Sequence, residues 1–129
     1  MGTLALAAKI THVPTMVLSE RVGAFKDCRK PAIDSLKALG EKAHEIGVDT
    51  FVVVDTHWLV NIGFHINANE RHTGVYTSHE IPHLLQDITY DIPGDPELGD
   101  LIAAAAPEVG LEAHAHKVPT LALEYGTLL

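Results

Sequence analysis

Residues 49–58 read Asp49-Thr50-Phe51-Val52-Val53-Val54-Asp55-Thr56-His57-Trp58. The apolar run inside this stretch shows no alternation, which is typical of a strand covered on both faces in a parallel sheet. We therefore predict a strand over residues 50–55. In open α/β sheets, ligands bind just beyond the carboxyl ends of the strands. His57 stands at such an end, where it is better placed for chemistry than for filling a core.

A helix is predicted immediately before this strand. Pro31 suits a first helical turn and Gly47 suits a left-handed stop, which together indicate a helix over residues 31–46. Apolar side chains recur along it at three- and four-residue steps and would face a sheet. These side chains are Ile33, Leu36, Leu39, Ala43 and Ile46.

The order of the elements supplies a second histidine. Residues 4–10 are apolar apart from Lys9 and predict a strand, which Pro14 ends. A strand–helix–strand unit in one sheet is nearly always right-handed and has parallel strands. His12 and His57 would then follow the carboxyl ends of neighbouring strands, within reach of one metal ion. We predict an α/β fold with a mostly parallel central sheet and flanking helices, begun by this right-handed βαβ unit.

The remainder of the chain predicts shorter elements. Asp95 and Pro96 are typical of a helix start, and this helix would run to about Ala106. Its inward side chains would be Leu98, Leu101, Ile102 and Ala105. The other predicted elements are a loop over residues 15–25, a half-exposed strand over 61–67, a turn over 69–74, a short extended piece over 75–77, a segment of either type over 88–92, a strand over 111–117 and an extended run over 120–124.

The composition excludes several classes of function. The chain has 129 residues, 47% of them apolar, which is the length of one domain. A net charge of -8 argues against nucleic-acid binding, and the sequence contains no apolar run long enough for a membrane helix. Cys28 is the single cysteine and the N-terminus lacks the basic region of a signal peptide, so we expect a cytoplasmic protein. Nine histidines favour a metal or proton-transfer site.

Two histidines need a third ligand. Two histidines with one carboxylate and open positions form the facial triad of non-haem Fe(II) oxygenases, whereas three ligands with a water also suit zinc. Asp55 and Glu124 are the carboxylates expected near the same rim, and neither is assigned as a ligand. Asp55 would either orient an imidazole from outside the ligand set or cap the turn after its strand.

The other histidines and the cysteine have simpler readings. His114 and His116 form an i, i+2 pair that predicts either a metal edge or, more simply, a solvated strand surface. His79 and His83 are expected in a loop because Pro82 stands between them. Two further histidines, His44 and His72, are expected to face solvent. Cys28 is expected to be a buried or idle thiol, because no base is evident beside it.

Several motifs together resemble one family, the class III (type II) extradiol ring-cleaving dioxygenases. The motifs are Lys9-Ile10-Thr11-His12-Val13-Pro14, Asp55-Thr56-His57-Trp58-Leu59-Val60-Asn61, Gly74-Val75-Tyr76-Thr77-Ser78, Asp95-Pro96-Glu97-Leu98-Gly99 and Leu123-Glu124-Tyr125-Gly126-Thr127-Leu128. The resemblance runs through essentially the whole chain. It covers the N-terminal part of a family whose members are roughly twice as long, so residues 1–129 are expected to be the N-terminal part of a single catalytic domain.

The resemblance implies a reaction and a metal. His12 and His57 match the family's two iron-binding histidines, whereas the third ligand, a glutamate, and the acid/base histidine lie beyond Leu129. Many relatives have Asp-His-Gly where this chain has Glu124-Tyr125-Gly126, so Tyr125 replaces a histidine that lines the pocket. The implied activity is ring opening of a catechol such as 3,4-dihydroxyphenylacetate (homoprotocatechuate) by O2 at Fe(II), giving a muconic semialdehyde.

Two other functions stay open at this point, a non-catalytic metal-binding or assembly module on the same fold and a zinc-dependent hydrolase. The isolated chain is expected to be poorly active, and to form a homo-oligomer or to need a missing C-terminal half. No nucleic-acid or membrane partner is expected.

Overall fold

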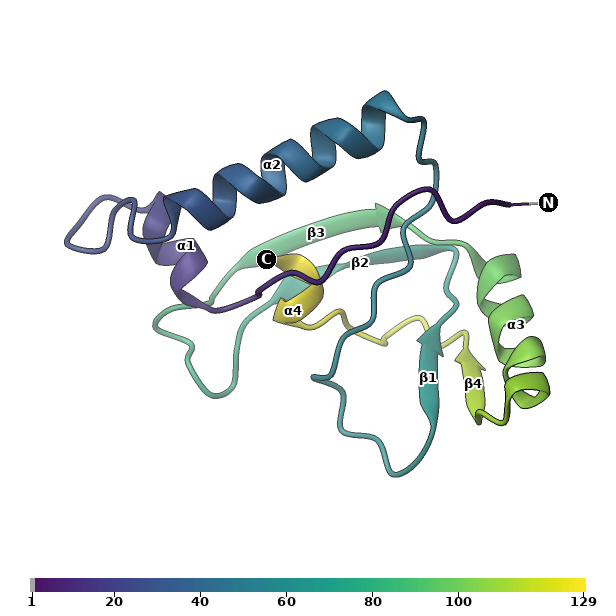
Figure 1. Ribbon diagram of the computed structural model, residues 1–129. Coiled ribbons are helices and arrows are strands. Elements are labelled where there is room, and N and C mark those ends of the chain that lie inside the picture. The colour runs from purple at the N-terminus through teal and green to yellow at the C-terminus, as the bar shows by residue number, and fades with distance from the viewer. Residues whose placement is uncertain (1) are drawn as a thin grey trace.

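The computed structural model describes residues 2–129, which form helices and two small sheets (Figure 1). Strand β1 pairs in parallel with β4, and β2 pairs antiparallel with β3. The predicted α/β class is confirmed, because the chain combines helices with a parallel strand pair. In chain order the elements are α1 (Thr15–Glu20), α2 (Lys30–Glu45), β1 (Phe64–Asn67), β2 (Arg71–Tyr76), β3 (Ile88–Pro93), α3 (Pro96–Ala105), the 3-10 helix η1 (Ala106–Val109), β4 (Ala113–His116) and α4 (Tyr125–Leu128).

The strands predicted over residues 4–10 and 50–55 do not form. Both segments lack regular secondary structure, and no backbone hydrogen bond joins either of them to another part of residues 2–129. The βαβ unit is therefore present only as two irregular segments on either side of α2. Phe51 to Val54 are between 56% and 78% exposed, so the cover that a buried parallel strand requires is absent within the described chain.

Helix α2 closely follows its predicted range. It spans Lys30–Glu45 with Pro31 in its first turn, and Gly47 adopts the expected left-handed backbone with φ of 74°. Of the predicted apolar face, Ala43 is buried and Ile46 is exposed. The residues before α2 differ from the prediction, because 15–20 form helix α1 rather than a loop. The Ser19 hydroxyl accepts a hydrogen bond from the backbone N–H of Arg29 at 2.9 Å and ties α1 to the start of α2.

Helix α3 packs on the β1–β4 pair through small residues. Asp95 caps it as predicted, its side chain accepting from the backbone N–H of Leu98 at 2.9 Å. Gly99 is buried so closely against Ala68 that a Cβ atom on Gly99 would lie 2.7 Å from the Cβ of Ala68. The predicted inward face is wrong at Leu101, Ile102 and Ala105, which are exposed, and only Leu98 is half-buried. The helix instead turns the side that carries Gly99 towards the strands.

The β2–β3 hairpin replaces the turn predicted over residues 69–74. Its first strand begins at Arg71, whose guanidinium pairs with Asp91 on β3. The segment over 88–92 is strand β3. His72 was expected to face solvent, but it is half-buried, and its Nδ1 atom is buried without a hydrogen-bond partner in the described chain. Burial lowers the pKa of His72, which favours the neutral ring.

The other predicted strands survive in shorter form. Residues 64–67 of the range 61–67 form β1, and residues 113–116 of the range 111–117 form β4. The run over 120–124 is not a strand and leads instead into helix α4. Among residues 2–129, no helix is both long and apolar enough to cross a bilayer.

Candidate metal centre

His12 and His57 meet in the structure. They come from the two irregular segments on either side of α2, and their ring centroids are 4.8 Å apart with the rings at 89° to each other. Both residues are partly buried. The fold thus brings together the two imidazoles whose proximity the order of elements predicts, although no strand carries either of them.

Asp55 holds the His57 ring. Its Oδ1 atom accepts hydrogen bonds from the ring Nδ1 of His57 and, at 3.1 Å, from the backbone N–H of the same residue. Its Oδ2 atom accepts from the hydroxyl of Thr127 at 3.0 Å. Burial by itself raises the pKa of Asp55, but the hydrogen bonds from His57 and Thr127 outweigh it, so the pKa lies below its ordinary value. Asp55 is therefore ionised at neutral pH.

This hydrogen bond decides which nitrogen of His57 is free. An ionised carboxylate can only accept, so Nδ1 of His57 must carry the hydrogen. In the neutral ring the lone pair is then on Nε2. A neutral imidazole with one nitrogen bonded to a carboxylate and the other free is the form in which histidine binds metals. Of the two roles considered for Asp55, orienting an imidazole is the one that these contacts support.

Aromatic side chains form a wall beside the two histidines. The Tyr125 ring lies 4.2 Å from the ring of His57 and 5.9 Å from that of His12, measured between centroids. Tyr76 lies behind it, 6.4 Å from Tyr125. Burial and the neighbouring Glu124 carboxylate raise the pKa of Tyr76, although a hydrogen bond with Ser78 opposes the shift. Sequence reasoning did not select Tyr76 as a site residue, although it lies inside one of the motifs that carry the family resemblance.

Hydrogen bonds from three other parts of the chain hold the segment over residues 121–128 in place. The Trp58 indole N–H donates to the carbonyl of Ala122 at 3.2 Å, and the Asn67 amide donates to the carbonyl of Leu121 at 3.3 Å. From β3, the Tyr90 hydroxyl accepts from the backbone N–H of Leu123 at 3.3 Å. These contacts place α4 beside the N-terminal segment, as Figure 1 shows, and so place Tyr125 against His12.

The imidazoles of His12 and His57 fit two metal ligands, and the described residues supply no third one. Within residues 2–129, no group of three His, Cys, Asp or Glu side chains converges to hold a metal ion. Both oxygens of Asp55 already accept hydrogen bonds, and the Glu124 carboxylate lies near enough to Tyr76 to raise the pKa of that phenol. The structure therefore offers neither carboxylate as a third ligand.

A second group of histidines lies on the β1–β4 pair. His65 and His114 are opposite one another in the parallel register, and His116 lies two residues further along β4. Nδ1 of His65 is 2.8 Å from Nε2 of His116, and Nε2 of His65 faces the carbonyl of Ile62 at 3.1 Å. Since a carbonyl only accepts, Nε2 of His65 carries a hydrogen, and in the neutral ring Nδ1 then accepts from His116. Hydrogen bonds thus occupy both nitrogens of His65, and His114 bonds to Glu112.

The remaining predicted residues stand apart from the site. His44, His79 and His83 are exposed, as expected for a helix surface and a loop. Cys28 is also exposed. Of the two expectations for its thiol, buried or idle, the buried one is therefore wrong.

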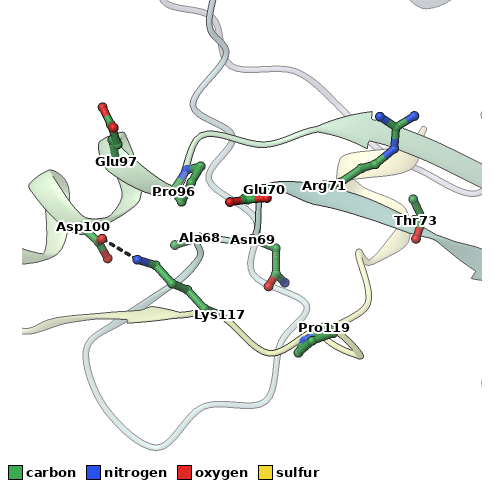
Figure 2. A pocket seen from close by; sticks show the side chains of 10 residues that line it. All are labelled: Ala68, Asn69, Glu70, Arg71, Thr73, Pro96, Glu97, Asp100, Lys117 and Pro119. Atoms are coloured by element: carbon green, nitrogen blue, oxygen red, sulfur yellow. Dashed lines mark hydrogen bonds and ion pairs between the residues drawn. The ribbon is translucent and has the colours of Figure 1, made fainter.

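A separate groove on the molecule contains no residue of the His12–His57 site (Figure 2). None of the histidines lines it, and its Lys117 and Asp100 form an ion pair at 2.6 Å. The side chains drawn around it come from the connection between β1 and β2, from β2 itself, from α3 and from the residues after β4. They are Ala68, Asn69, Glu70, Arg71, Thr73, Pro96, Glu97, Asp100, Lys117 and Pro119.

Comparison with known proteins adds an independent observation about the chain. A family profile described as the catalytic LigB subunit of aromatic ring-opening dioxygenase matches residues 6–129. A curated relative, the 3,4-dihydroxyphenylacetate 2,3-dioxygenase of Escherichia coli, is 54% identical over 129 residues, which are 100% of this chain and 47% of the relative. The chain thus spans about half the length of the curated relative it matches.

Proposed function

The chain belongs to the LigB family of aromatic ring-opening dioxygenases, and on that premise we propose that it forms part of an extradiol dioxygenase. Its substrate would be a catechol such as 3,4-dihydroxyphenylacetate, and its co-substrate O2. The substrate class is supported by the name of the 54% identical relative. The product would be a muconic semialdehyde.

The observation that carries this proposal is the His12–His57 pair. Their rings lie 4.8 Å apart, and the Asp55 carboxylate leaves Nε2 of His57 free. These two imidazoles would hold Fe(II). The metal would supply open positions that bind both catechol hydroxyls and bring O2 beside them.

The chain's own residues would hold this site in shape. Asp55 fixes the orientation of His57, and Tyr125 covers one side of both imidazoles. Tyr125 therefore bounds the space in which a substrate ring would sit, and its phenol is placed to affect which catechol fits.

We propose that residues 1–129 form one wall of the catalytic domain and that a further segment completes it. The absence of a third ligand among the described residues supports this, as does the coverage of 47% of the relative. The exposed run from Phe51 to Val54 supports it as well, because such a run is normally covered in a parallel sheet. Alternatively, a second copy of the chain would cover the exposed run from Phe51 to Val54.

A chimera tests this function. Residues 1–129 of this chain would be joined to the part of the E. coli relative that follows its matched region, and oxygen uptake and yellow product would be measured with Fe(II) and 3,4-dihydroxyphenylacetate. We expect the chimera to turn over and the isolated chain to show little activity, because two imidazoles alone hold the metal weakly. Robust turnover by the isolated chain would contradict the incomplete site, and an iron-loaded, folded chimera without turnover would contradict the function.

A non-catalytic binding or assembly module is the second candidate. The observation in its favour is that no three ligating side chains converge in residues 2–129. In that case the chimera would stay inactive, and iron binding would not change when His12 or His57 is replaced by alanine.

A further inference from the structure

We propose that Thr127 is a positioning residue that sets the ring tautomer of His57 through Asp55. Thr127 lies 72 residues from Asp55 in the sequence, and its hydroxyl donates to Oδ2 of that carboxylate at 3.0 Å. The consequence for metal binding rests on the proposed function, whereas the effect on the tautomer does not.

The three hydrogen bonds on Asp55 divide between its two oxygens. Oδ1 takes the ring and the backbone N–H of His57, and Oδ2 takes Thr127. Within residues 2–129, Thr127 is the one donor found on Oδ2. The torsion that turns a carboxylate about its Cβ–Cγ bond is broad, so bonds on one oxygen alone hold its plane loosely. The bond to the second oxygen fixes that plane and keeps Oδ1 directed at Nδ1 of His57.

The charge and partial burial of Asp55 strengthen its hydrogen bond with Thr127. The Asp55 and His57 side chains are only 18% and 19% exposed. The Thr127 hydroxyl is the donor in this bond, and the carboxylate oxygen accepts. Hydrogen bonds to an ionised group are about twice as strong as neutral ones, and partial burial strengthens them further.

Thr127 is itself held in place by its helix. It lies in α4, where its backbone N–H donates to the carbonyl of Glu124 at 3.0 Å. The preceding residue, Gly126, has no Cβ and therefore lets the turn approach the carboxylate. The same short helix thus presents Tyr125 to the His57 ring and Thr127 to the carboxylate that orients that ring.

The test compares Thr127→Val, which keeps the shape of the side chain and loses the hydroxyl, with Thr127→Ser, which keeps the hydroxyl. Long-range 1H–15N NMR on the metal-free chain, at about pH 8.5 where imidazoles are neutral, reports the His57 tautomer. We expect the Nδ1–H form in the wild type and in Thr127→Ser, and a mixture with the Nε2–H form in Thr127→Val. An unchanged tautomer in Thr127→Val, or its loss in Thr127→Ser as well, would overturn the proposal.

A second variant and an iron-binding measurement complete the test. If Thr127→Val fails to fold, Thr127→Ala removes the hydroxyl without bulk, and its spectrum is judged by the same two outcomes. In the chimera, we expect Thr127→Val to weaken Fe(II) binding by about 10- to 100-fold, the usual cost of losing a group that orients a ligand. A shifted tautomer with unchanged iron affinity would support the positioning role and contradict His57 as a ligand, so the two proposals fail separately.

Discussion

Replacing His57 by alanine in the chimera is expected to abolish ring opening and to weaken Fe(II) binding by more than about 100-fold. The loss should exceed the roughly 10- to 100-fold cost of removing an orienting neighbour, because a ligand itself is lost. His12→Ala should have the same effect, since the two rings lie 4.8 Å apart and would share one ion. Equilibrium dialysis with Fe(II) and oxygen uptake measure the two quantities on the same samples.

A histidine outside the site is the matched control, because its replacement shows what the loss of a histidine that is not a ligand does to iron binding. His44 is exposed on α2, away from the site, so His44→Ala should leave iron affinity and oxygen uptake close to those of the parent chimera. Equal iron affinity in His57→Ala and His44→Ala would contradict the assignment of His57. A loss confined to one of His12 and His57 would contradict a site that they share.

Adding a single methyl group at Gly126 is expected to destabilise the chain by about 1–3 kcal/mol, the usual cost of overpacking. A Cβ atom there would lie 2.6 and 2.7 Å from the two carboxylate oxygens of Asp55 and 2.8 Å from Nδ1 of His57. The three atoms belong to a hydrogen-bonded pair, so relief of the clash must move α4 or break the pair. Urea denaturation of Gly126→Ala measures the loss, and the NMR signals of His57 should shift with it.

Gly40→Ala is the matched control for this substitution. Gly40 lies inside α2, and a Cβ atom there would meet nothing within 4 Å. Alanine is the better helix former by up to about 1 kcal/mol, so Gly40→Ala should stabilise the chain. The two glycine substitutions are therefore expected to have opposite signs. Stabilisation by Gly126→Ala would show that α4 does not press on the Asp55–His57 pair.

Local signals in the sequence predicted the two longer helices, α2 and α3, but neither α1 nor α4. Pro31 and Gly47 bound α2 to within one residue at either end, and Asp95 caps α3 as its residue type suggests. The same reasoning placed His12 and His57 together, because both follow apolar segments separated by one helix. That inference depends on the order of elements, and it holds even though the predicted strands do not form in residues 2–129.

Features that depend on contacts between residues far apart in the sequence could not be predicted from local patterns. The strands at 4–10 and 50–55 were predicted from apolar content, but a strand exists only when another strand bonds to it, and none does within the described chain. The contacts of Thr127 and Gly126 with Asp55 join residues more than 70 positions apart. Threonine and glycine are common in turns, so neither residue type signals such a contact.

The number of imidazoles bound to iron tests the central claim most directly. Iron-edge X-ray absorption of the Fe(II)-loaded chimera counts them, and we predict two in the parent protein and one in each of His12→Ala and His57→Ala at saturating iron. A parent spectrum without two imidazoles, or one that is unchanged in both variants, would contradict a metal centre built on His12 and His57.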